Sequence, residues 1–198
     1  MSKPFDFYHG IQLTEEMYDF FLDDKNYTQN FPKTSADADE NYGGEDDIQW
    51  LKLTDIKEAH LEFLDNVIPK GVIPEGSYLE WDAALYKKGY KLPPHTESED
   101  TTRDGDPRVA IGKFILWVTR DSFKGRDFAY GRLEGNIDAT EKSTSFSWDD
   151  PRLIEEGRIH PKNGDACYLR LDNPNYYHGV TELLSNAKVC TISTFIFI

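Results

Sequence analysis

A histidine and a glutamate two residues apart, His95 and Glu97, could together bind a metal ion. They stand in the segment "PPHTESED", at the end of a strand-like run. On an extended backbone, side chains two residues apart project to the same side, so both can reach one ion. The same triplet also occurs by chance in solvated loops, which is where most such residues lie. The local sequence does not choose between a metal site and a polar loop.

A second histidine, His178, follows a polar Asp-Asn-Pro-Asn turn at the start of another strand-like stretch, "YYHGVTEL". Two imidazoles and one carboxylate can form a facial triad that leaves three positions of an octahedral iron open. Asp100 or Glu99 could take the place of Glu97 as the carboxylate. The competing interpretation of His178 is a hydrogen-bonded histidine at the end of a strand.

Lys188 begins the C-terminal run "KVCTISTFIFI", whose alternation puts it on one face with Cys190 and Ile192 and puts Val189 on the other. If the face with Lys188 lines the interior, the ammonium needs an anion, because an unpaired buried charge costs several kcal/mol. A dicarboxylate cosubstrate would supply that anion. The alternative is a lysine at the exposed start of a strand, where it protects an edge from aggregation.

The elements that must position these residues fall into two parts. In "LTEEMYDFFLDD" apolar residues recur at helical spacing behind Thr14, which predicts a capped helix over 13–24. The polar, acidic stretch 26–47 predicts a long surface loop, and "TDIKEAHLEFLDNVI" over 54–68 predicts a second helix. From Ser77 onward, short runs rich in aromatic and β-branched residues alternate with turns, which predicts strands. These runs are "SYLEWDAALYKKGYKL", "RVAIGKFILWVT", "DFAYGRLEGNID", "STSFSW", "ACYLRL", "YYHGVTEL" and "KVCTISTFIFI".

Helices followed by seven or eight strands predict a mainly β fold, a jelly-roll or cupin-like barrel buttressed by N-terminal helices. With 198 residues the chain is expected to form a single domain, with helical support and the acidic loop in 1–76 and the jelly-roll core in 77–198.

Composition limits the partners. The sequence has 22 Lys and Arg against 36 Asp and Glu, a formal charge of -14, which would repel a nucleic-acid backbone. The two cysteines, Cys167 and Cys190, are far apart and do not indicate a disulfide framework. No run approaches the length that a membrane span needs. We expect a cytoplasmic protein without a nucleic-acid or membrane partner.

The order and spacing of these features resemble the Fe(II)/2-oxoglutarate-dependent oxygenases, specifically the prolyl 4-hydroxylase-like branch. The resemblance consists of His95-x-Glu97, a distal His178 and Lys188 ten residues later. It extends to "LYKKGYKLPPH" before the first ligand, "ILWVTRDSFKGRDFAYG" as a hairpin and "HPKNGDACYL" as a turn. It covers about 78–198 and implies a double-stranded β-helix. Two departures are Glu97, where this branch mostly has Asp, and Lys124-Gly125 in place of a double glycine.

The resemblance implies that His95, Glu97 and His178 hold Fe(II), and that Lys188 pairs with the far carboxylate of 2-oxoglutarate. Tyr86, nine residues before His95, is the candidate hydroxyl donor to the cosubstrate, or else a packed barrel tyrosine. O2 is the second cosubstrate, and ascorbate is an expected accessory reductant. The reaction would hydroxylate a peptide, including a prolyl peptide, or a small molecule, with release of succinate and CO2.

The primary substrate is left open by the sequence. Arg103, Arg126 and Trp148 are candidate contacts, each with a solvated or packed residue as the competing interpretation. The expected assembly is a monomer or a homodimer.

Two other classes of function stay open: a cupin-like binding module without iron, and a zinc hydrolase that uses the same three ligands. Lys188 argues against both, because neither needs a cation there. Conversely, a Lys188 ammonium on the outer surface of the barrel would contradict the oxygenase interpretation.

Overall fold

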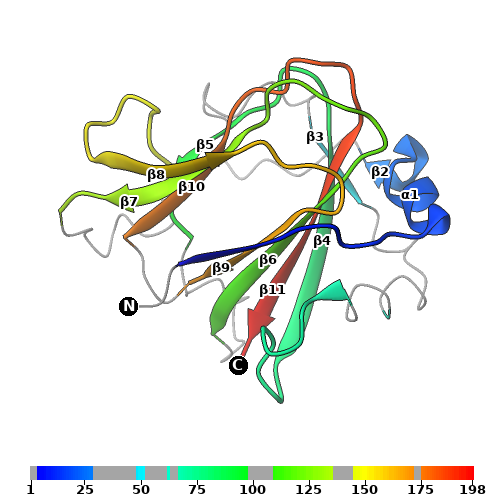
Figure 1. Cartoon of the computed structure of the whole chain (residues 1–198), viewed down its shortest axis with the longest axis horizontal. Coiled ribbons are helices and arrows are strands. Elements are labelled where there is room, and N and C mark those ends of the chain that lie inside the picture. The colour runs from blue at the N-terminus through cyan, green and yellow to red at the C-terminus, as the bar shows by residue number, and fades with distance from the viewer. Residues whose placement is uncertain are drawn as a thin grey trace.

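Two antiparallel sheets face each other in the computed structural model (Figure 1). It describes residues 4–28, 48–51, 62, 67–97, 109–135, 145–171 and 175–198. The larger sheet has seven strands in the order β1-β9-β6-β11-β4-β3-β2, and the smaller has four in the order β5-β10-β7-β8. From β4 to β11, consecutive strands alternate between the two sheets except for β7 and β8, which pair with each other in the smaller sheet; this is the connectivity of a double-stranded β-helix. The predicted fold class is therefore confirmed.

The helical elements are α1 (Glu15–Phe21) and the short 3-10 helix η1 (Asp24–Asn26). The strands are β1 (Phe5–Tyr8), β2 (Tyr27–Thr28), β3 (Ile48–Leu51), β4 (Tyr78–Tyr86), β5 (Leu92–His95), β6 (Ala110–Val118), β7 (Phe128–Leu133), β8 (Leu153–Ile159), β9 (Ala166–Arg170), β10 (Tyr176–Val180) and β11 (Val189–Phe197). No helix among the described residues is long and apolar enough to cross a membrane.

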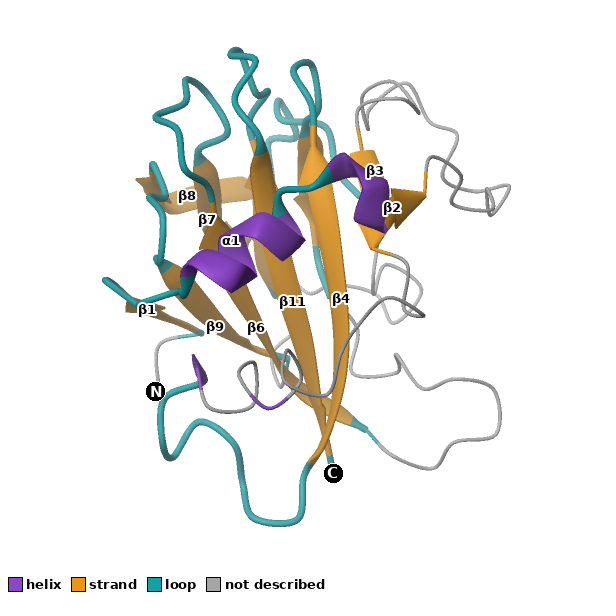
Figure 2. Cartoon of the chain, turned by 90° about the vertical axis from the view of Figure 1, so that its right-hand side faces the viewer, coloured by secondary structure: helices purple, strands orange, loops and turns teal. Residues whose placement is uncertain are grey.

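Strand β11 is the centre of the larger sheet, because it pairs along its whole length with β4 on one side and with β6 on the other. One face of this sheet packs against α1, as Figure 2 shows. Cys190, Ile192 and Ile196 lie on that outer face with Met17 and Phe21 of the helix. The opposite face of β11 looks toward the smaller sheet, with Phe197 in the same cluster as Phe128 and Val180. The predicted alternation along β11 is therefore confirmed.

Helix α1 begins where the sequence predicts. The Thr14 side chain accepts a hydrogen bond from the Met17 amide at 3.3 Å, so it satisfies one of the free N–H groups of the first turn. Of the second predicted helix, over 54–68, Glu62 and Val67 are helical, and most of the range lies outside the described residues. The predicted acidic loop over 26–47 also lies mostly outside them.

Most predicted strands are present, but some elements differ from the prediction. Of the predicted strand over 143–148, the described residues 145–148 contribute an isolated bridge between Ser145 and His95. Strands β1, β2, β3 and β8 were not predicted, and β2 lies within the range predicted as an acidic loop. In β8, "LIEEGRI", three charged residues interrupt the apolar alternation, because β8 is an edge strand of the smaller sheet.

A close approach of two backbones makes Gly131 a sensitive position. A Cβ there would lie 2.1 Å from the Ile154 carbonyl oxygen of the paired strand β8. We predict that Gly131→Ala lowers the free energy of unfolding by about 1 to 3 kcal/mol, since β7 and β8 must separate to admit the methyl group. Equilibrium unfolding in urea measures the change. Arg132→Ala, which removes only an exposed ion pair with Glu156, is the control and should cost less than about 1 kcal/mol. Equal stability of Gly131→Ala and wild type would contradict the prediction.

Candidate metal centre

Three potential metal ligands from two paired strands meet between the sheets. His178 of β10 lies directly opposite His95 at the end of β5, and Glu97 follows two residues later. One ligand atom from each of these three residues lies within 4.8 Å of the others. The Glu97 Oε1 atom is 3.6 Å from His95 Nε2 and 3.7 Å from His178 Nε2. The sequence predicted these three residues, and the structure brings them together.

Each imidazole is fixed by its neighbours. The His95 Nδ1 atom lies 3.0 Å from the Pro93 carbonyl oxygen, which can only accept, so Nδ1–H donates and the Nε2 atom faces Glu97. The His178 side chain is buried, and its ring stacks on Phe128 with centroids 5.4 Å apart. The burial and the nearby His95 hold the pKa of His178 well below its usual value, so the ring is neutral at physiological pH. The neutral ring of His178 is the form that binds a metal.

A buried lysine that the sequence analysis did not identify completes the charge balance. Lys113, on the inner face of β6, donates to Glu97 Oε1 at 2.6 Å. Burial opposes the ammonium charge, but Glu97 and then Asp82 raise the pKa of Lys113. Burial alone would likewise raise the pKa of Glu97, yet Lys113 and the two imidazoles hold it well below its ordinary range. The carboxylate is therefore ionised and available as a ligand.

Tyr86 faces the same interior. Its hydroxyl forms a hydrogen bond of 2.9 Å with the Thr191 hydroxyl of β11, and both side chains are buried. Ala84, Tyr86 and Val189 form a small cluster with Leu183, and Leu92 packs against both this cluster and the one that contains Phe128. The structure thus places Tyr86 inside the barrel. Its role toward a cosubstrate stays a prediction.

Lys188 is not at the site, and the prediction that its ammonium faces the interior is corrected. The side chain lies on the α1 side of the larger sheet, shares the face of Cys190 and Ile192, and is 48% exposed. Its Nζ atom pairs with the Asp24 carboxylate at 2.8 Å and donates to the Leu22 carbonyl at 3.1 Å. Lys188 and Tyr86 both line a hollow of about 420 Å³. The Lys188 ammonium nevertheless pairs with Asp24 of η1, outside the barrel interior. This position contradicts the oxygenase interpretation in the form that relied on Lys188 as the partner of the far carboxylate. An oxygenase function must therefore rest on the triad and the fold, with another cation in that role.

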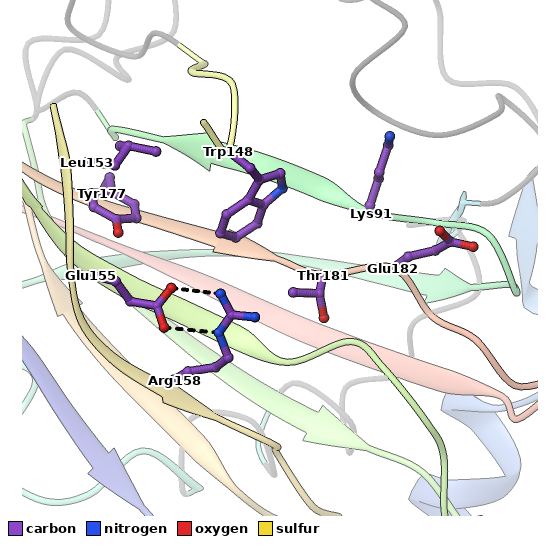
Figure 3. Close-up of a pocket in the computed structure, with 8 residues that line it drawn as sticks. All are labelled: Lys91, Trp148, Leu153, Glu155, Arg158, Tyr177, Thr181 and Glu182. Atoms are coloured by element: carbon purple, nitrogen blue, oxygen red, sulfur yellow. Dashed lines mark hydrogen bonds and ion pairs between the residues drawn. The ribbon is translucent and has the colours of Figure 1, made fainter. Parts of the chain in front are cut away.

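Of the candidate substrate contacts, Trp148 lies on the outside of the smaller sheet. It lines a hollow of about 450 Å³ with Lys91, Leu153, Glu155, Arg158, Tyr177, Thr181 and Glu182 (Figure 3). Tyr177 and Thr181 alternate along the chain with His178 and Val180, so this hollow and the triad lie on opposite faces of β10. Arg158 is paired there with Glu155 at 2.7 Å. Arg126 is fully buried, and Arg103 lies outside the described residues.

Two residues of this interior had a signal in the sequence that the analysis missed. Lys113 in "AIGKFILWV" and Asp82 in "YLEWDAALY" are single charges in otherwise apolar strands. Such a charge at an inward position must be paired, because an isolated one would be too costly to bury. Each lies an even number of positions from strand residues that face the interior, so alternation along the strand was the available clue.

Comparison with solved structures finds the same fold in several proteins of low sequence identity. The chain matches a Trichoplax adhaerens prolyl hydroxylase, solved in complex with a hypoxia-inducible-factor oxygen-degradation-domain peptide fragment, at 12% identity and a TM-score of 0.57, over 98% of this chain and 83% of that one. It matches HygX from Streptomyces hygroscopicus, solved with nickel and 2-oxoglutarate, at 15% identity and a TM-score of 0.57, over 97% of this chain and 82% of that one. It matches ycfD of E. coli at 11% identity and a TM-score of 0.51, over 98% of this chain. The match spans only about half (49%) of ycfD.

The sequence motifs predicted this resemblance, and the matches confirm it at the level of the fold. No protein-family model matches the sequence, and no curated protein matches it either.

The charge on Asp82 gives a prediction about pH. Burial raises the pKa of Asp82 from 3.8 to about 6, against the opposing effect of Lys113. Between these values the native state holds a proton that the unfolded chain has released, so the free energy of unfolding falls as pH rises. We predict that Asp82→Asn removes a loss of up to about 3 kcal/mol between pH 4 and pH 7. Urea unfolding of both proteins across that range measures it, and parallel profiles would contradict the assignment.

Proposed function

We propose that the protein is an Fe(II)- and 2-oxoglutarate-dependent dioxygenase that hydroxylates a peptide or a small molecule. The observation that carries the proposal is the meeting of His95, Glu97 and His178 inside a double-stranded β-helix. The same fold contains nickel and 2-oxoglutarate in HygX. The proposal does not depend on Lys188.

The donor set fits a ferrous ion. Bonds of about 2.1 Å place neighbouring ligands of an octahedral metal about 3.0 Å apart, so the observed 3.6 and 3.7 Å need only a small closure. Two imidazole nitrogens and one carboxylate oxygen would hold such an ion and would leave room for a chelating keto acid and oxygen. Glu97 stands where this branch mostly has aspartate, and Lys113 holds its carboxylate from the β6 side.

With iron and 2-oxoglutarate bound, the centre supplies the oxidising chemistry, in which decarboxylation to succinate and CO2 accompanies hydroxylation of the substrate. The chain contributes binding and orientation. His95 and His178 hold their Nε2 atoms toward one point, and Lys113 keeps Glu97 ionised and fixed. The apolar cluster with Phe128 and Val180 limits water around the centre. Tyr86 presents a hydroxyl group to the interior.

Both substrate classes stay within the proposal. Among the fold neighbours, the prolyl hydroxylase was solved with a peptide and HygX with the small molecule hygromycin B. Prolyl hydroxylation is thus one candidate activity among several, since a fold does not fix its function. O2 is the expected oxidant, and an ascorbate requirement is a further expectation.

The direct experiment is an anaerobic titration of Fe(II) and 2-oxoglutarate, followed through the visible charge-transfer band of the chelate. We predict that wild type forms the band with one iron per chain. His178→Ala should lose it, with metal affinity falling by more than the roughly 10- to 100-fold that outer-shell changes cause. His160→Ala is the matched control, because His160 is a histidine outside the triad, paired with Asp127. It should keep the full band.

Aerobic assays separate the alternatives. An oxygenase should convert 2-oxoglutarate to succinate slowly even without its primary substrate, and only with iron and oxygen. A zinc hydrolase would be active with zinc and indifferent to 2-oxoglutarate and oxygen. A non-catalytic cupin-like module would form no succinate under any iron condition. Either of the last two results would overturn the proposal.

A further inference from the structure

The barrel interior contains a second cation, Arg126, for which the described residues supply no carboxylate partner. Arg126, two residues before β7, is only 1% exposed. Its Nε and Nη1 atoms are buried and have no hydrogen-bond partner among the described residues. A guanidinium is always ionised, and an unpaired buried charge costs several kcal/mol. Such a residue is expected where an anion binds.

The guanidinium lies against Tyr86, inside the barrel. Its central carbon is 3.5 Å from the centroid of the Tyr86 ring and 5.7 Å from that of Tyr90. The Tyr86 hydroxyl in turn forms a hydrogen bond with the Thr191 hydroxyl. A cation and two hydroxyl groups, contributed by β4, β11 and the start of β7, therefore lie close together. This is the donor set that would bind a carboxylate.

The backbone holds Arg126 in this position at a cost. Its φ of 57° is in the left-handed region, which is strained for a residue other than glycine. The preceding Gly125 has a φ of 73°, and a Cβ there would lie 2.0 Å from the Glu182 carbonyl oxygen. The Arg126 amide donates to the same carbonyl at 2.9 Å. This hydrogen bond ties the turn before β7 to the segment that follows β10. It therefore fixes the position of the Arg126 backbone.

The cluster and the triad are aligned along the same strands. Tyr130 of β7 lies opposite His178, and Phe128 lies opposite Val180. Arg126 is four residues before Tyr130, and because its φ of 57° departs from an extended path, its backbone lies at most about 13 Å from that of Tyr130. An arginine side chain and a short dicarboxylate, placed end to end, can bridge such a separation. Phe128, whose ring stacks on His178, lies between Arg126 and Tyr130 in the chain.

We propose that Arg126, with the Tyr86 and Thr191 hydroxyls, binds the far carboxylate of 2-oxoglutarate, in place of Lys188. This inference rests on the proposed function. Lys113 is the other buried cation near the triad among the described residues, and it is already paired with Glu97. Arg126 is therefore the cation that is available to pair with a carboxylate. The assignment also moves the anion-binding residue from β11 to the start of β7.

The test compares two keto acids on protein loaded anaerobically with Mn(II). 2-Oxoglutarate and 2-oxobutyrate share the chelating end, and only the first has a far carboxylate. Calorimetry should show that wild type binds 2-oxoglutarate at least about 10-fold more tightly. Arg126→Met should lower 2-oxoglutarate affinity by about 10- to 100-fold, the scale of hydrogen bonds to a charged group, and leave 2-oxobutyrate affinity unchanged. Arg126→Lys, which keeps the charge, should retain part of the preference.

Two controls make the outcome specific. Lys188→Met should keep the full preference for 2-oxoglutarate, because its ammonium pairs with Asp24 outside the interior. The melting temperature of metal-free Arg126→Met should equal or exceed that of wild type, because removing an unpaired buried charge relieves its cost. A purely structural Arg126, supporting Tyr86, would instead lower the melting temperature and weaken both keto acids equally.

The two proposals fail in different ways. If wild type loaded with Mn(II) binds neither keto acid, the oxygenase proposal itself fails. If wild type prefers 2-oxoglutarate and Arg126→Met keeps that preference, only the assignment to Arg126 is overturned. Loss of the preference in Lys188→Met would return the role to Lys188.

Discussion

The pairing of β10 with β5 is the constraint on which the site depends. It sets His178 directly opposite His95, and the chain then needs only two more residues to bring Glu97 to the same point. A shift of one residue in this register would turn every side chain of β10 to the other face of the sheet. His178 would then face the outer hollow with Trp148, and Tyr177 would enter the barrel. The register between these two strands therefore determines whether the three candidate ligands can meet.

The second organising feature is the balance of charge between the sheets. Glu97 and Asp82 bring negative charge into the interior, and Lys113 lies close to both. This local pairing accounts for an ionised Glu97 despite its burial, since a nearby cation outweighs the cost of desolvation. Arg126 has no such partner among the described residues. Among the described residues, the interior therefore has one paired cation, Lys113, at the candidate metal centre and one cation without a carboxylate partner, Arg126, beyond it. That asymmetry is what a cosubstrate with a chelating end and an anionic end would balance.

The sequence predicted the parts of the structure that depend on local pattern. Helix α1 and its Thr14 cap follow from apolar spacing and a capping residue, and the faces of β11 follow from strict alternation. The three metal-ligand candidates were found because histidine and carboxylate side chains at strand ends are chemically distinctive. Alternation alone assigned Lys188 to a face, but not that face to the inside or the outside. This depended on α1 covering it, which is a tertiary contact.

Arg126 could not have been assigned in the same way. The sequence analysis considered it as a substrate contact, but nothing in "KGRDF" indicates a left-handed arginine packed on a tyrosine forty residues earlier. Its position is set by the turn that joins the start of β7 to the segment after β10. Strand β8 was missed for a different reason, because its pairing with β7 does not require an apolar alternation. Long-range contacts, rather than local propensity, determine these features.

The central claim is that three side chains from β5, the residues after it and β10 form one metal site. A titration of the protein with Mn(II), followed by electron paramagnetic resonance of the free ion, tests it most directly. The account predicts that wild type removes one equivalent of free Mn(II) signal per chain and that Glu97→Ala and His95→Ala each abolish this uptake. Uptake by those variants equal to that of wild type, or no uptake by wild type, would contradict it.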